Sequence, residues 1–93
     1  MTGRLRLRPA TILHWRRWGS DYIVFDGASG RTHQLDPLTA GTLLAIEESP
    51  KSLAVLAEHL AVDLSLDGDA LLTTLPAIVE QLSLVGLIET TAE

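Results

Sequence analysis

The sequence predicts an α+β fold of winged helix-turn-helix type, with an N-terminal three-stranded antiparallel sheet followed by three helices. Two patterns support this. The first 35 residues are rich in β-branched and aromatic residues and are broken by glycine-bearing turns. The rest carries apolar residues at helical spacing, in segments that begin at residues able to cap a helix. A length of 93 residues without cysteine suits one domain, 1–93, with no disulfide framework.

The strand candidates follow one another closely. Leu5–Arg8 alternates apolar and charged residues, and Pro9 confines this segment to an edge or a strand end. Residues 11–18 and 22–25 are rich in β-branched and aromatic residues and are separated by a break at 19–21. After the turn cluster at 26–30, Arg31–Leu35 forms a short third strand. These segments predict a meander of three antiparallel strands within residues 5–35.

The helices are expected near 37–48, 52–61 and 68–85. Asp36 can cap the first helix, and Pro37 fits its first position, where no N–H is needed. Ser52 can cap the second helix, and the polar segment 63–68 is a loop that supplies a cap for the third. Gly86 suits the position after the third helix, and Leu87–Glu89 is expected to add a short strand or to pack on the core.

The third helix carries two apolar stripes. The main one consists of Leu71, Leu75, Ile78, Leu82 and Val85. The second, beside it, consists of Leu72, Pro76 and Val79. Together they span about 180° of the helix surface, wider than the roughly 100° that a one-sided helix needs. Either the helix is buried on two sides in its own fold, or the second stripe lines a groove for another molecule. Pro76 removes one backbone hydrogen bond, so a kink is expected there.

Charge is distributed unevenly along the chain. Residues 1–35 have a net charge of +4, residues 36–93 have −9, and the whole chain has −5. Two interpretations stay open: solvated faces of both signs, or a basic sheet that meets an acidic partner. No apolar run approaches the roughly 18 residues of a membrane helix, and no apolar segment of a secretory signal follows the N-terminal arginines. Cytoplasmic residence, without membrane association, is therefore expected.

Catalytic and metal-binding patterns are not found. His14, His33 and His59 are scattered, with no metal-ligand spacing and no nucleophile beside them. Asp63-x-Ser65-x-Asp67-Gly68 resembles the front half of a calcium loop, but Thr74 stands where a bidentate glutamate is needed. The expectation is a protein that is not an enzyme and uses no metal and no cofactor.

Nucleic-acid binding has one sequence feature in its favour. Trp15 and Trp18 flank Arg16 and Arg17, which is a basic and aromatic combination. The helical part, however, has one lysine and no arginine, and the chain is acidic, so phosphate groups are repelled. A DNA-binding winged-helix regulator and a structural or dimerising interaction domain are two functions that this reasoning leaves open.

The helical part of the sequence contains the segments Leu35-Asp36-Pro37-Leu38-Thr39-Ala40, Leu43-Leu44, Ser52-Leu53-x-x-Leu56-Ala57-x-x-Leu60 and Leu82-x-x-x-Gly86-Leu87-Ile88. Together these segments resemble the PqqD-like family of peptide chaperones, or precursor-peptide recognition elements. The stretch Trp15-x-x-Trp18, then Tyr22-x-Val24-Phe25-Asp26-x-x-Ser29-Gly30-x-Thr32-His33-x-Leu35-x-Pro37, is similar to a subgroup from systems with an HPr-kinase-related protein. The resemblance covers about residues 5–89.

This resemblance implies that a leader peptide adds as a strand to the sheet edge and fills a cleft between the third strand and the third helix. The implied peptide-binding residues are Arg31, Thr32, His33, Gln34, Leu35, Leu72, Pro76 and Val79. The alternative for Arg31–Leu35 is an ordinary edge strand. The implied partners are a precursor peptide and a peptide-modifying enzyme, with no nucleic acid and no membrane, and a homodimer is left open.

Overall fold

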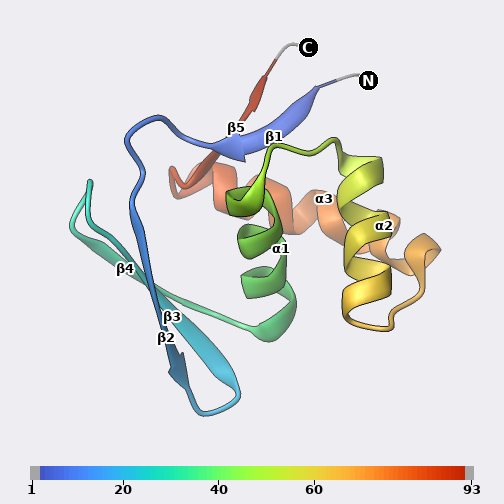
Figure 1. The fold of residues 1–93 in the computed structure, drawn as a ribbon, viewed down its shortest axis with the longest axis horizontal. Coiled ribbons are helices and arrows are strands. Elements are labelled where there is room, and N and C mark those ends of the chain that lie inside the picture. The colour runs from blue at the N-terminus through green and yellow to red at the C-terminus, as the bar shows by residue number, and fades with distance from the viewer. Residues whose placement is uncertain (1–2, 92–93) are drawn as a thin grey trace.

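The computed structural model describes residues 3–91 and contains two small antiparallel sheets and three helices (Figure 1). The strands are β1 (Arg4–Leu7), β2 (Leu13–Trp18), β3 (Asp21–Asp26), β4 (Arg31–Leu35) and β5 (Ile88–Thr91). The helices are α1 (Pro37–Glu48), α2 (Leu53–Asp63) and α3 (Gly68–Leu84). The predicted α+β class, with a three-stranded sheet followed by three helices, is confirmed.

The three-stranded sheet has the order β2-β3-β4, and each strand is antiparallel to its neighbour. Two tight turns join the strands, and Gly19 (φ 64°) and Gly30 (φ 75°) adopt the left-handed conformation there. Residues 5–8 do not belong to this sheet. Residues 5–7 lie in β1, which pairs with β5 near the other end of the chain, and Arg8 follows this strand, so the three-stranded sheet begins only at Leu13.

Lys51 connects the second sheet to the end of α1. Its backbone bonds to Leu5 in both directions, at 2.7 and 3.0 Å. Its buried ammonium donates to the Ala45 carbonyl at 2.6 Å and to the carbonyl and hydroxyl of Ser49 at 3.2 and 3.0 Å, with the Glu48 carboxylate at 3.6 Å. Lys51 thereby satisfies carbonyls that the end of a helix leaves free.

The helices begin where the sequence predicts, because their caps form locally. The cap side chains accept from the backbone N–H groups of the first turn: Asp36 from Thr39 at 2.7 Å, Ser52 from Val55 at 3.2 Å and Asp67 from Asp69 at 3.2 Å. The helix bounds differ from the predicted ones by at most two residues. Among residues 3–91 no helix is long and apolar enough to cross a membrane.

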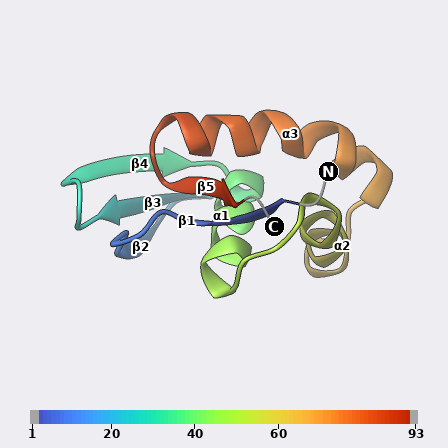
Figure 2. The ribbon, with the colours of Figure 1, turned by 90° about the horizontal axis from the view of Figure 1, so that it is seen from above.

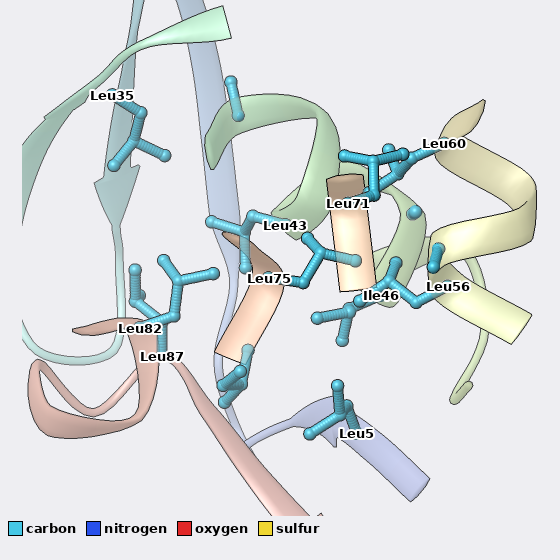
Figure 3. Close-up of a cluster of buried hydrophobic side chains, with 14 of the residues drawn as sticks. Leu5, Leu35, Leu43, Ile46, Leu56, Leu60, Leu71, Leu75, Leu82 and Leu87 are labelled. Atoms are coloured by element: carbon cyan, nitrogen blue, oxygen red, sulfur yellow. The ribbon is translucent and has the colours of Figure 1, made fainter. Parts of the chain in front are cut away.

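The core lies between α1, α2, α3 and β5, with Leu5 and Leu35 at its margins (Figure 3). From the main stripe of α3, Leu71, Leu75 and Leu82 are buried, and the other two residues are half-buried. The second stripe is different. Leu72 is 45% exposed and Pro76 is exposed, whereas Val79 packs partly against the core. The interpretation that α3 is buried on two sides is therefore wrong, although the helix does continue through Pro76.

Candidate functional site

β4 is an edge strand, and its backbone offers hydrogen bonds on one side. Within residues 3–91 it pairs with β3 and with no other strand. The Gly27 N–H donates to the Ile12 carbonyl at 2.9 Å, which identifies this pair as hydrogen-bonded. Antiparallel pairs alternate between bonded and non-bonded, so the register makes His14 and Phe25 the next bonded pair of β2 and β3. Val24, one residue from Phe25, therefore directs its backbone groups toward β4.

The same alternation locates the free groups of β4. Val24 lies opposite His33 and Tyr22 lies opposite Leu35, so these pairs are the bonded ones between β3 and β4. The N–H and C=O groups of the alternate residues Thr32 and Gln34 then point away from the sheet. β4 accordingly has two free donors and two free acceptors in a straight row, which is the pattern that an added strand needs.

A hollow of about 390 Å³ lies beside this edge. It is lined by Thr32, His33, Gln34, Leu35, Asp36, Thr39, Gln81, Leu82 and Val85. These residues come from β4, from the N-cap and first turn of α1, and from the last turn and C-cap of α3, whose C-terminal, red end lies toward the sheet (Figure 2). The hollow therefore lies between the third strand of the sheet and the third helix.

The lining has an apolar floor and a polar rim. Leu35 and Leu82 are buried and Val85 is half-buried, whereas Thr32, Gln34 and Gln81 are exposed. This distribution suits one or two apolar side chains held below a hydrogen-bonded backbone.

Two titratable side chains line the hollow. The Asp36 carboxylate is occupied by the Thr39 N–H at 2.7 Å. His33 Nε2 is buried and has no hydrogen-bond partner within the described part of the chain. Buried polar atoms are usually satisfied, so this nitrogen is an exception among the residues that line the hollow.

Asp26 holds the turn that leads into β4. Its carboxylate accepts from the Ala28 N–H and from the Ser29 hydroxyl, both at 2.9 Å. Burial raises the pKa of the Asp26 carboxyl, but these hydrogen bonds, together with those from the Ile12 and Ser29 backbones, lower it by more, so the pKa lies below its ordinary value of 3.8. The charged form is thus the one that the β3–β4 turn stabilises.

The structure divides the predicted site residues into two groups. Thr32, His33, Gln34 and Leu35 line the hollow, and Arg31 is exposed at the start of β4. Leu72, Pro76 and Val79 lie in earlier turns of α3 and are not among the lining residues, so their role in peptide binding stays a prediction.

On the helix side the hollow is lined by Gln81, Leu82 and Val85, none of which the sequence analysis places in the site. Leu82 and Val85 are assigned to the core stripe, and Gln81 has no distinguishing pattern. The residue type alone therefore contains no signal that would have identified these three.

No family model matches the chain, and no curated protein matches it. Two solved structures are similar in fold. One is TbiB1 in complex with the TbiA(beta) leader peptide, with 16% identity and a TM-score of 0.69 over 95% of this chain and 99% of that one. The other is lasso peptide synthetase B1 complexed with the leader peptide, with 22% identity and a TM-score of 0.64 over 91% of this chain and 96% of that one. The likeness extends over nearly the whole fold.

Proposed function

We propose that this chain is a peptide-recognition domain that binds a precursor peptide as an added strand on β4 and presents it to a modifying enzyme. The observation that carries the proposal is the free backbone of Thr32 and Gln34 beside an apolar-floored hollow. The fold supports it, because both similar structures are complexes with leader peptides.

Binding would combine two physical contributions. A peptide paired with Thr32 and Gln34 gains up to four backbone hydrogen bonds, each worth about 0.5–1.5 kcal/mol net. The side chains of a strand alternate between faces, so every second peptide side chain would enter the hollow over Leu82 and Val85. Backbone pairing supplies affinity for any strand, and the hollow selects an apolar side chain.

The proposed role is non-catalytic. The hollow has no side chain of nucleophilic type paired with a base: its titratable residues are Asp36, which caps α1, and His33. We also place the chain with the PqqD-like proteins, and with their subgroup from HPr-kinase-related systems, on the sequence stretches quoted above. That resemblance, rather than a contact in this structure, is the reason for proposing a modifying enzyme as a partner.

A peptide fits this surface better than a nucleic acid does. α3, which a DNA-binding winged helix would use for recognition, has no Lys or Arg and carries Asp69 and Glu80. A phosphate backbone would meet net negative charge there.

The test is selection from a display library of short linear peptides, followed by titration of a selected peptide. Binding should slow amide exchange at Thr32 and Gln34 more than at the exposed amides of α2. Thr32→Pro should weaken binding while Thr32→Ala does not, because only the first change removes the backbone donor. Selected peptides that bind both variants equally, without protecting these amides, would contradict strand addition at β4.

A further inference from the structure

The sheet has a second free edge, at β2. Among the described elements β2 pairs only with β3. Since Ile12 and His14 are bonded to β3, the alternate residues Leu13, Trp15 and Arg17 direct their N–H and C=O groups outward. This edge is longer than the one at β4 and lies on the opposite side of the sheet.

An apolar hollow accompanies this edge as well. It has a volume of about 140 Å³ and is lined by Trp15, Arg16, Arg17, Tyr22 and Leu44. Tyr22 and Leu44 also line a separate hollow of about 300 Å³ between α1 and α2. Leu44 is 41% exposed, although α1 has other positions that are fully buried.

Contacts within the protein fix the aromatic side chains that line the hollow at β2. The Trp15 Nε1–H donates to Glu47 Oε1 at 3.1 Å, and the Trp15 ring meets the Tyr22 ring edge-on at 6.5 Å. The Arg17 guanidinium lies over the Tyr22 ring, 5.5 Å from its centre. These side chains are already ordered without a ligand, so binding would not have to offset the conformational entropy of fixing them.

The charges along β2 indicate which kind of strand can pair with it. Arg16 and Arg17 are exposed, and within residues 3–91 no carboxylate lies at ion-pair distance from either guanidinium. An antiparallel pairing of β2 with β2 of a second copy would place arginines of both copies on each face of the joined sheet, and this like charge opposes self-association. A strand that carries Asp or Glu opposite these arginines would instead form favourable cross-strand charge pairs.

We propose that the β2 edge is a second strand-binding site, which accepts an extended, acidic segment of a partner protein with an apolar side chain for the Trp15–Tyr22–Leu44 hollow. The charge of the edge selects against a copy of this chain and for an acidic partner.

The experiment first silences the β4 edge with Thr32→Pro and Gln34→Pro, and then selects binders for the folded variant from a display library of short linear peptides. The selected peptides should be rich in Asp and Glu alternating with apolar residues. They should protect the Leu13, Trp15 and Arg17 amides and bind less tightly as salt rises. A silenced protein that selects no binders, or binders without acidic residues, overturns the proposal.

The matched variants each reverse two exposed arginines. Arg16→Glu with Arg17→Glu should weaken binding on the order of tenfold or more, while Arg4→Glu with Arg8→Glu, in and just after β1, should leave it unchanged. Melting curves check folding, and Arg16→Gln with Arg17→Gln replaces the charge reversal if that variant fails to fold. Equal effects of the two pairs of substitutions, or sedimentation showing β2-dependent dimers, would instead assign this edge to non-specific charge or to a second copy.

Discussion

Val24 and His33 lie directly opposite each other in β3 and β4, and the bonded pairing of their backbones decides what the sheet edge presents. Because the pattern alternates, Thr32 and Gln34 on either side of His33 keep their backbone groups free. These three residues of β4 therefore differ in their backbone roles: His33 holds the strand in the sheet, and its neighbours direct their N–H and C=O groups away from it.

Proline substitutions should separate these roles. Thr32→Pro and Gln34→Pro should leave the fold intact, because a proline is tolerated on an edge strand whose N–H faces outward. Each should weaken the binding of a selected peptide about tenfold, which corresponds to the loss of roughly one backbone hydrogen bond. His33→Pro should destabilise the sheet itself, since its N–H bonds to Val24. Melting temperature and peptide titration on the same samples check this, and a normally folded His33→Pro protein would refute the assigned alternation.

Val79 and Leu72 test the second stripe of α3. Val79 packs partly on the core, so Val79→Asp should cost about 1–3 kcal/mol of unfolding free energy. Leu72 is 45% exposed, so Leu72→Asp should change stability by no more than about 0.5 kcal/mol. Denaturant unfolding measures both changes. Peptide binding that is unchanged in folded Leu72→Asp would remove this position from the predicted site.

Asp26 should make the stability of the sheet depend on acid. Its pKa in the folded protein is below the ordinary value of 3.8, so its stabilising contribution is fully present above that value. The contribution is lost as the pH falls through the lowered folded-state pKa. Thermal melts between neutral pH and about pH 2 should therefore fall more steeply for the wild type than for Asp26→Asn, which cannot change its charge. Parallel pH curves would show that other carboxyls dominate acid unfolding.

The buried Lys51 should contribute more to stability than the exposed Glu48 with which it forms an ion pair. Lys51→Met keeps the apolar stem but removes the donors to Ala45 and Ser49, at an expected cost of about 1–3 kcal/mol. Glu48→Ala removes only the partly exposed ion pair, whose loss should cost less than about 1 kcal/mol. Chemical denaturation of the two variants gives the comparison, and similar losses for both would contradict a capping role for Lys51.

Much of the fold is determined by the sequence alone, because its causes are local. Asp36 and Ser52 cap helices by accepting from backbone N–H groups three residues away, and the apolar spacing in α2 and α3 selects the buried faces. The strand that ends at Leu35 and the glycines of the turns can also be predicted from the sequence, because their signals are local. A resemblance carried by these stretches was sufficient to predict the α+β arrangement and the strand side of the hollow.

Only the tertiary structure decided which residues meet across long separations in the chain. β1 pairs with β5 rather than with the next strand, and Lys51 bonds with Leu5, since both pairings depend on how the helices bring distant segments together. The helix side of the hollow is similar: periodicity identifies an exposed stripe at Leu72 and Pro76, but the angle between α3 and the sheet brings Gln81 and Val85 to β4. That angle results from core packing, which no local pattern in the sequence records.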